Sequence, residues 1–293
     1  MNVFLFEQYG FYPGELENNE FFINGFEYRL IEVEVGEDEI SKKDQYCTIL
    51  NSFYGDELMV KVIKNKSSNY ISYYNGKKYC LLSILKKDMI VNDLNVMHVK
   101  FKNYESLDLF KIMNLWKTRS DYIENVGVAS LRVDSIFYGE NLEKSLFGLG
   151  LCQNAIQYLN EVIHEYGSNF NGLTLTHKRL KNLCSFDFFN PFNIVLDHPI
   201  RDLVELYKND FFTVESLVEV LKFYEIDSKI ASLFLSRLLY PSSIFDQIEN
   251  SELSNSNKFK IDFNIEKECV KIKNVYTYFR KKYNIRPISW LEN

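Results

Sequence analysis

The chain has 293 residues, enough for one large domain or for two lobes with a buried core. A hydrophobic content of 46% and a charged content of 25% are ordinary for a globular protein and exclude wholesale disorder. The net charge of −6 disfavours nucleic acid as the main partner, because binding a phosphate backbone requires concentrated positive potential.

The cysteines and the apolar runs exclude further classes of protein. The five Cys residues are scattered and form no C-x-x-C pair, so they predict neither a zinc site nor a disulfide framework. No secretory leader opens the sequence, and no apolar run reaches the roughly 18 residues that a membrane span needs. We therefore expect a cytoplasmic protein with reduced thiols, no membrane span and no nucleic-acid partner.

The first third of the sequence has the pattern of β structure. Asn24-Gly25 and Asn75-Gly76 each separate two apolar runs, which is the strongest short signal for a β-hairpin. Between these hairpins, apolar residues recur at near-helical spacing from Ile40 to Phe53. The predicted strands lie within 1–35, 58–63 and 70–85, and one helix is predicted over 37–54.

Beyond residue 104 the apolar residues recur with the period of an α-helix. Thr213 and Asp227 suit helix N-caps, and Pro241 ends the helix that follows Asp227. Helices are predicted over 109–123, 149–166 and 265–283 and after Thr213 and Asp227, and residues 249–258 are predicted to form a polar loop.

Strands followed by helices indicate an α+β protein with two lobes. We expect a β-rich N-lobe at 1–86, a hinge or linker at 87–104 and a helical C-lobe at 105–293. The C-lobe contains an unusual stretch, 174–202. There an apolar-rich segment leads into His177, and a second apolar run ends at Asp197, before Arg201-Asp202 opens a helical pattern.

That order of features resembles the catalytic region of kinase-like proteins. The layout is similar to the kinase-like fold of aminoglycoside and choline phosphotransferases. Within that fold it resembles the YutH/CotS group of spore-coat-associated proteins, and most of all the YutH type. The segments that carry the resemblance are NGKKYCLLSI (75–84), GLCQNAIQYL (150–159), THKRL (176–180), NPFNIVLDHPIRDLVELYK (190–208), RLLYPSSIFD (237–246) and IRPISWL (285–291).

The resemblance implies catalytic residues that this sequence has mostly replaced. His177 matches the His of the catalytic loop, but Arg179 stands at the position of the catalytic Asp and Cys184 at that of the metal-binding Asn. Ile31 stands where the strand Lys that steadies ATP is expected, and strand alternation points Arg29 away from the face of its two neighbours. A cation in place of the Asp cannot accept a proton and would repel Mg²⁺.

Asp197 and the Arg201-Asp202 pair are the features that remain. The resemblance implies a Mg²⁺-binding role for Asp197 and a structural role for Arg201 and Asp202. From the residues alone, Asp197 can instead cap the turn before Pro199. Asp202 can be a helix N-cap or a buried partner of a loop backbone. For His177, a core histidine with a satisfied hydrogen bond is favoured over a catalytic role.

The resulting hypothesis is a catalytically degenerate kinase-like protein, a pseudokinase, acting as a structural or interaction module in bacterial spore coat formation. Other spore coat proteins are its expected partners, the forespore surface or the coat its expected site in the cell, and no cofactor is expected. The alternative is a divergent small-molecule phosphotransferase that uses ATP and Mg²⁺, with Asp197 holding the metal and another carboxylate as the base. A third hypothesis is a nucleotide sensor that binds ATP without turnover.

Overall fold

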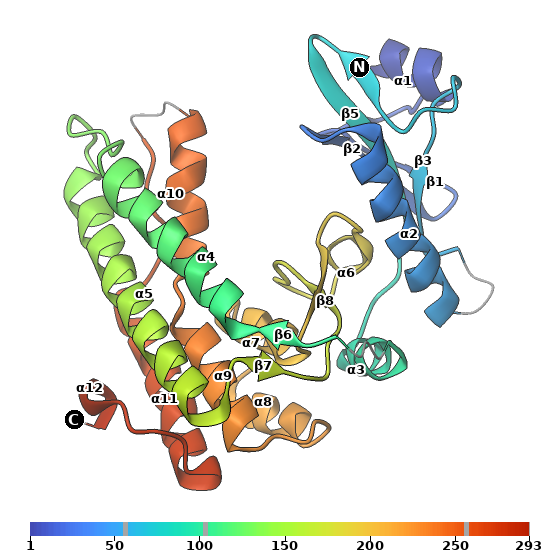
Figure 1. The fold of residues 1–293 in the computed structure, drawn as a ribbon. Coiled ribbons are helices and arrows are strands. Elements are labelled where there is room, and N and C mark those ends of the chain that lie inside the picture. The colour runs from blue at the N-terminus through green and yellow to red at the C-terminus, as the bar shows by residue number, and fades with distance from the viewer. Residues whose placement is uncertain (55–57, 102–104, 255–257, 293) are drawn as a thin grey trace. The chain divides into compact units, whose positions relative to one another are not determined.

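The computed structural model describes residues 1–54, 58–101, 105–254 and 258–292 (Figure 1). The chain divides into two compact units, each made of two stretches of sequence. Unit 1 comprises Met1–Lys102 and Thr174–Asp197, and unit 2 comprises Asn103–Leu173 and His198–Asn293. The first change of unit falls inside the predicted linker 87–104, part of which is helix α3 (Val91–Lys100). Most of the unusual stretch 174–202 thus belongs to the unit that holds the N-terminal sheet.

Unit 1 is built on an antiparallel sheet with the order β1-β2-β5-β3, in which β4 also pairs with β5. Both predicted hairpins are confirmed, because Asn24 and Gly25 turn at φ 50° and 82° and Asn75 and Gly76 at φ 49° and 77°. Positive φ at both central residues is the turn geometry that Asn-Gly favours. The strands are β1 (Glu20–Ile23), β2 (Phe26–Glu32), β3 (Val60–Ile63), β4 (Ser72–Tyr74) and β5 (Lys77–Leu85).

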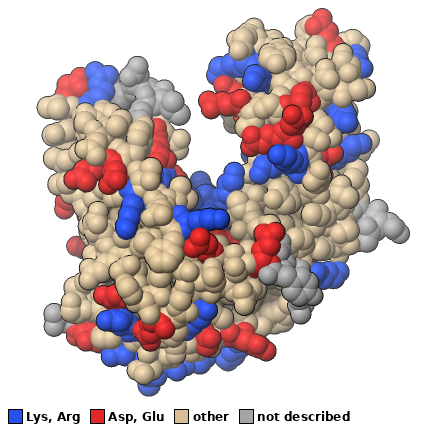
Figure 2. Space-filling model, in the orientation of Figure 1, with Lys and Arg blue, Asp and Glu red and all other residues tan. Residues whose placement is uncertain are grey.

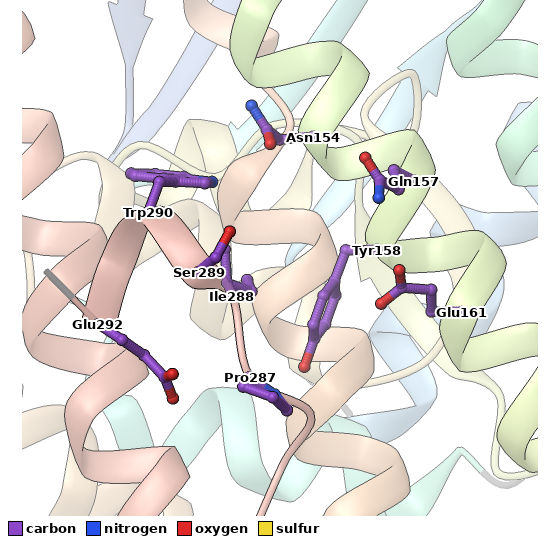
Figure 3. A pocket seen from close by; sticks show the side chains of 9 residues that line it. All are labelled: Asn154, Gln157, Tyr158, Glu161, Pro287, Ile288, Ser289, Trp290 and Glu292. Carbon is purple, nitrogen blue, oxygen red and sulfur yellow. The ribbon is translucent and has the colours of Figure 1, made fainter.

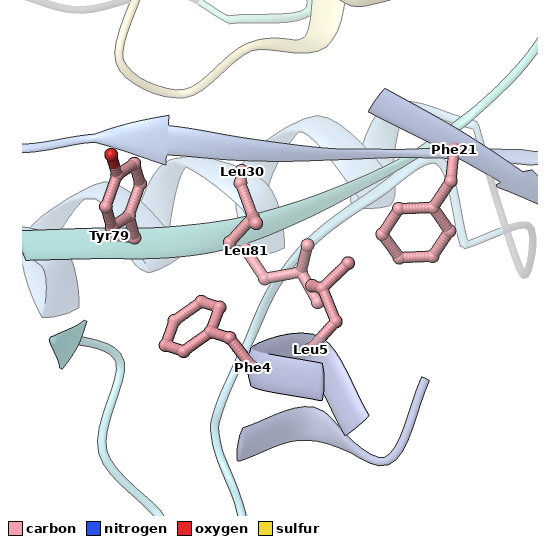
Figure 4. Close-up of a cluster of buried hydrophobic side chains, with 6 residues drawn as sticks. All are labelled: Phe4, Leu5, Phe21, Leu30, Tyr79 and Leu81. Carbon is pink, nitrogen blue, oxygen red and sulfur yellow. The ribbon is translucent and has the colours of Figure 1, made fainter. Parts of the chain in front are cut away.

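One face of this sheet is covered by helix α1 (Asn2–Tyr9), where the sequence predicted β structure. That prediction was wrong for these residues because tertiary packing decides the conformation of so short a segment. Figure 4 shows Phe4 and Leu5 of α1 meeting Leu30 and Leu81 of the sheet, and all four are buried. Gly10 then ends the helix at φ 83°, and its N–H donates to the Phe6 carbonyl.

Helix α2 (Glu37–Phe53) confirms the helix predicted over 37–54 and is fixed to the edge strand β3. The Asn51 Oδ1 accepts from the Met59 and Val60 N–H groups, at 2.8 and 3.0 Å, and its Nδ2 donates to the Val60 carbonyl at 2.9 Å. One amide side chain thus satisfies three backbone groups where the edge strand begins. Ile40, Cys47 and Leu50 form the buried face of α2.

Unit 2 is mainly helical, and α5 packs against α4, α9 and α10 while α9 also packs against α7 and α11. The two-stranded pair β6 (Leu107–Asp108) and β7 (Asn169–Phe170) completes it. Its helices are α4 (Leu109–Tyr122), the π-helical turn η1 (Ile123–Gly127), α5 (Tyr138–Tyr166), α7 (Ile200–Lys208), α8 (Val214–Leu221), α9 (Ser228–Leu239), α10 (Ser242–Ser254), α11 (Ile265–Tyr283) and α12 (Ser289–Glu292). Among the described residues, no helix is both long enough and apolar enough to cross a bilayer.

Helix α10 corrects the loop predicted at 249–258, because the helix continues through Ser254. Its buried residues Ile244, Phe245 and Ile248 lie in the first two turns, and the polar residues that follow continue a helix that has already been nucleated. Gly127 of η1 approaches this helix so closely that a Cβ there would come within 2.7 Å of Ile248. Residues 255–257 of the predicted loop lie outside the described residues.

Arg119 of α4 joins this helix to α10. Its Nε and Nη2 donate to the two carboxylate oxygens of Glu249 at 2.7 and 2.6 Å, and its Nη2 also donates to Asp246 at 2.6 Å. Burial opposes the charge of Arg119, but the hydrogen bonds to Glu249 and Asp246 outweigh it and raise the pKa of the guanidinium. A bidentate pair of this kind fixes the relative rotation of two helices as well as their separation.

We expect Arg119→Ala to lower the free energy of unfolding by about 1–3 kcal/mol, because it leaves two partly buried carboxylates without their donor. Arg119→Lys should recover only part of the loss, since an ammonium cannot make the bidentate contact. The measurement is urea unfolding followed by circular dichroism. Arg132→Ala, which breaks the exposed pair with Asp134, is the control and should change stability by less than about 0.5 kcal/mol. Equal effects of Arg119→Ala and Arg132→Ala would contradict this account.

Candidate functional site

Residues 174–197, most of the stretch that resembles a kinase catalytic region, form a short hairpin that belongs to unit 1. Strands β8 (Thr174–His177) and β9 (Ile194–Asp197) pair antiparallel, with His177 opposite Ile194 and Thr174 opposite Asp197. The Thr174 hydroxyl donates to the His98 carbonyl of α3 at 3.1 Å, which fixes the base of the hairpin on that helix. The residues between the strands carry helix α6 (Ser185–Phe189).

His177 is fully buried and serves as an internal tie in this hairpin. Its Nε2 lies 2.9 Å from the Phe188 carbonyl, and its ring is 5.4 Å from the Phe188 ring. A carbonyl can only accept, so Nε2 carries the proton in this contact. The histidine therefore holds the end of α6 against the strand, which is the core role that the sequence favoured.

Asn193 fixes the backbone of the loop that contains Arg179. Its Oδ1 accepts from the Arg179 N–H at 3.0 Å, and its Nδ2 donates to the Arg179 carbonyl at 2.6 Å. Its Nδ2 is also 3.3 Å from the Asp187 carbonyl. The same side chain thus satisfies both backbone groups of Arg179 and joins them to α6. Arg179, which stands where the resemblance places the catalytic Asp, is therefore a cation on a fixed backbone.

Cys184, which stands where the resemblance places a metal-binding Asn, is the N-cap of α6. Its Sγ accepts from the Asp187 N–H at 3.5 Å, and its own N–H donates to Asn182 Oδ1 at 2.9 Å. An Asn at an N-cap would offer an oxygen, whereas a thiol is a poor ligand for Mg²⁺. Cys184 thus caps the helix but offers no oxygen ligand.

Arg29 of β2 is committed to neighbours within unit 1. Its Nη2 lies 2.8 Å from Glu20 and 2.7 Å from Glu27, and its guanidinium lies 3.5 Å over the Phe186 ring of α6. Tyr28 and Leu30 pack in the α1 cluster instead, so the predicted opposite orientation of Arg29 is confirmed. On strand β2, where the resemblance places a lysine that contacts ATP, the charge of Arg29 is thus balanced by two carboxylates and its guanidinium stacks on an aromatic ring.

Positive charge gathers on the loop between β8 and α6. Lys178, Arg179 and Lys181, here called the basic loop, follow β8 directly. Burial lowers the pKa of Lys43 on α2, and the charge of Lys178 lowers it further. Arg179 and Lys181 also line a hollow of about 310 Å³, together with Asp187, Asn190, Phe192 and Asn193. Elsewhere on the face shown in Figure 2, acidic and basic side chains are interspersed.

Asp197 and Asp202 are both buried, at 3% and 0% exposure. Asp197 ends β9, where the resemblance places a Mg²⁺ ligand, and Arg201 and Asp202 lie in the first turn of α7. The N-cap of α7 is Pro199, so the interpretation of Asp202 as an N-cap was wrong; the helix starts earlier because Pro fits its first positions. In the described parts of the chain, no three His, Cys, Asp or Glu side chains are grouped as metal ligands.

Three contributors to the site were not found from the sequence. Glu27 was detectable, because it lies two residues from Arg29 on one strand and therefore on the same face. Asn193 and Phe186 gave no such signal, since their partners are distant in sequence and depend on how the hairpin folds back. The predicted metal role of Asp197 and the structural role of Arg201 and Asp202 stay predictions.

The sequence of this chain matches one protein family over almost its full length. The family described as "Spore coat putative kinase YutH" matches residues 2–279, nearly the whole chain. The chain belongs to this YutH family. No curated protein matches the sequence significantly. The YutH membership makes this a kinase-like spore coat protein and agrees with the resemblance carried by the segments between residues 75 and 291.

Solved structures show the fold of this YutH-family chain. The crystal structure of spectinomycin phosphotransferase APH(9)-Ia in complex with ADP and spectinomycin is 11% identical, with a TM-score of 0.53 and coverage of 95% of this chain and 93% of that one. The predicted α+β, protein-kinase-like fold, with a β-rich N-lobe and a mainly helical C-lobe, is confirmed at the level of the fold.

Two further structures are similar at lower TM-scores. Choline kinase LicA from Streptococcus pneumoniae is 13% identical, with a TM-score of 0.45 and coverage of 90% and 92%. An aminoglycoside phosphotransferase from Alicyclobacillus acidocaldarius is 9% identical, with a TM-score of 0.43 and coverage of 93% and 90%.

If His177 is a structural tie, His177→Leu should lower the free energy of unfolding by about 1–3 kcal/mol, because it leaves the buried Phe188 carbonyl without a donor. His177→Gln should recover part of this, since its amide can donate. His164→Ala, on the exposed side of α5, is the control and should change stability by less than about 0.5 kcal/mol. Thermal unfolding of the three variants measures the effect, and a wild-type melting curve for His177→Leu would refute the tie.

Proposed function

We propose that this YutH-family protein is a pseudokinase, and that it acts as a structural or interaction module in spore coat formation without using a cofactor. The observation that carries the proposal is the fixed position of Arg179. Both of its backbone groups are held by Asn193, so the loop cannot easily rearrange to bring a carboxylate to that point. Phosphoryl transfer depends on positioned groups that orient the hydroxyl and neutralise charge, so this change removes the orienting group.

ATP and Mg²⁺, the cofactors of the alternative hypothesis, fit the remaining residues poorly. Mg²⁺ requires oxygen ligands. Where the resemblance places the metal-binding Asn and the catalytic Asp, however, this chain has the thiol of Cys184 and the cation of Arg179. Arg29 could in principle contact phosphate in place of the missing lysine. Its guanidinium, however, already contacts Glu20, Glu27 and Phe186, and a phosphate would have to displace these contacts.

The basic loop supplies the interaction surface of the proposed module. Lys178 and Lys181 are exposed and Arg179 is half-buried, while the chain as a whole has a net charge of −6. A concentrated cationic point on an acidic protein attracts an acidic segment of a partner and repels basic ones. We therefore propose that the partner, another spore coat protein, contacts this loop through carboxylates.

The second candidate is a divergent small-molecule phosphotransferase that uses ATP and Mg²⁺. It is favoured by Asp197, a buried carboxylate that stands at the end of β9, where the family places its metal-binding Asp. In this case another carboxylate would act as the base. A nucleotide sensor that binds ATP without turnover is intermediate between the two candidates.

Calorimetric titration with ATP, with and without Mg²⁺, separates these functions. For the pseudokinase we expect no Mg²⁺-dependent binding and no ATP hydrolysis above that of an empty-vector preparation. Binding that is strengthened by Mg²⁺ and lost in Asp197→Asn would establish a metal role for Asp197, and turnover lost in the same variant would establish the phosphotransferase. Nucleotide binding without turnover would instead identify the sensor.

A fluorescent fusion followed through sporulation tests the coat module. We expect the wild-type fusion to gather at the forespore surface. Arg179→Glu combined with Lys181→Glu should leave the fusion largely diffuse, because it reverses the charge of the basic loop. Lys111→Glu combined with Lys117→Glu on α4 makes the same change of charge elsewhere and should leave localisation intact. A diffuse wild-type signal would contradict the coat role, and equal localisation of both double variants would contradict the role of the loop.

A further inference from the structure

A second concave site lies entirely within unit 2, and no residue of the β8–β9 hairpin lines it. Its volume is about 330 Å³, and helix α5 and the segment after α11 enclose it. Figure 3 shows its side chains: Asn154, Gln157 and Glu161 from α5, and Ser289, Trp290 and Glu292 from the C-terminal segment, with Tyr158 and Ile288 between them. The proposed function does not involve this pocket, although its walls lie largely in two of the segments, 150–159 and 285–291, that carry the family resemblance.

The pocket is preformed, because hydrogen bonds fix the C-terminal segment that makes its wall. The Tyr276 hydroxyl accepts from the Ile288 N–H at 3.1 Å and donates to Glu292 at 2.9 Å. Arg280 donates to the Ile285 carbonyl at 2.7 Å, and Leu291 is buried. A wall held in this way costs a ligand little ordering entropy.

Several polar groups of the pocket have unused hydrogen-bonding capacity. Among the described residues, none hydrogen-bonds with the side chains of Gln157, Ser289 or Trp290. Asn154 uses only its Nδ2, which donates to the Gly150 carbonyl. In the view of Figure 3, the Ser289 hydroxyl, the Asn154 amide and the indole nitrogen of Trp290 are turned toward the same space. The site thus offers both donors and acceptors.

The charge of the pocket is already neutralised. Arg286 pairs with Glu161 at 3.0 Å, and Arg280 pairs with Glu292 at 3.3 Å. These contacts use one oxygen of each carboxylate, so the second oxygen can still accept a hydrogen bond. A cationic ligand would compete with two guanidinium groups, and an anion would meet two carboxylates. A neutral ligand with several hydroxyl groups suits this arrangement best.

Trp290 adds an aromatic surface for a ligand, because this residue lines the pocket and is 38% exposed. An indole offers an apolar face and one donor at its edge, which matches a ligand with a C–H face and a polar rim. We propose that this pocket is a saccharide-binding site. In it, Trp290 contacts the apolar face of a sugar ring, while Gln157, Asn154, Ser289 and the carboxylates of Glu161 and Glu292 bind its hydroxyl groups.

Tryptophan fluorescence tests this site directly, because Trp290 is one of only two Trp residues and the other, Trp116, is buried and stacked on Tyr240. We would titrate the full chain with N-acetylglucosamine trisaccharide and, separately, with maltotriose. At least one should change the emission, with a Kd on the order of 1 mM or tighter. Gln157→Ala, which keeps the fluorophore, should weaken binding by about fivefold or more.

Asn160→Ala on an exposed position of the same helix is the matched control and should bind as the wild type does. Lysine amide is the cationic comparison and should leave the emission unchanged. The proposal is overturned if neither trisaccharide changes the emission, if lysine amide binds as tightly as the sugars, or if Gln157→Ala and Asn160→Ala bind equally. None of these outcomes affects the pseudokinase proposal, whose tests concern nucleotide and unit 1.

Discussion

The hydrogen bonds of Asn193 are the constraint on which the candidate site depends. They hold both backbone groups of Arg179 and connect them to helix α6 at Asp187, while His177 ties the next residue of this helix, Phe188, to strand β8. The backbone around the position where the resemblance places the catalytic Asp is therefore held by hydrogen bonds within the chain itself. Stability and catalysis are separable here, because the ties act through the backbone and the chemistry would act through side chains.

Local signals in the sequence were sufficient to predict the secondary structure where a few neighbouring residues determine the backbone conformation. Both Asn-Gly pairs are found at positive φ, and α2 follows its predicted bounds closely. The same signals failed for α1 and for the end of α10. For α1 the conformation follows from contacts with the sheet, which join residues that are far apart in the sequence, and for α10 the helix continues from a buried start.

In the candidate site, too, some features could be predicted from neighbouring residues and others depended on tertiary contacts. The core role of His177 and the orientation of Arg29 followed from hydrophobic context and from strand alternation, which are properties of a few neighbouring residues. The clamp by Asn193 and the stacking of Phe186 on Arg29 could not be derived, because each requires the hairpin to be folded before the partner is known. For Asp202, its burial in the first turn of α7 was not distinguishable from an N-cap, because the two positions differ by only a few residues.

The discontinuity of unit 1 has a consequence for the synthesis of the protein. Its sheet is complete in sequence by Leu85, but the hairpin that supplies Phe186, His177 and Asn193 leaves the ribosome only after the first stretch of unit 2 has been made. Until residue 197 has emerged, Arg29 has its carboxylate partners but not the ring on which it stacks. The nascent sheet therefore spends part of translation with one face incomplete, an interval in which a chaperone would meet a surface that the finished protein no longer presents.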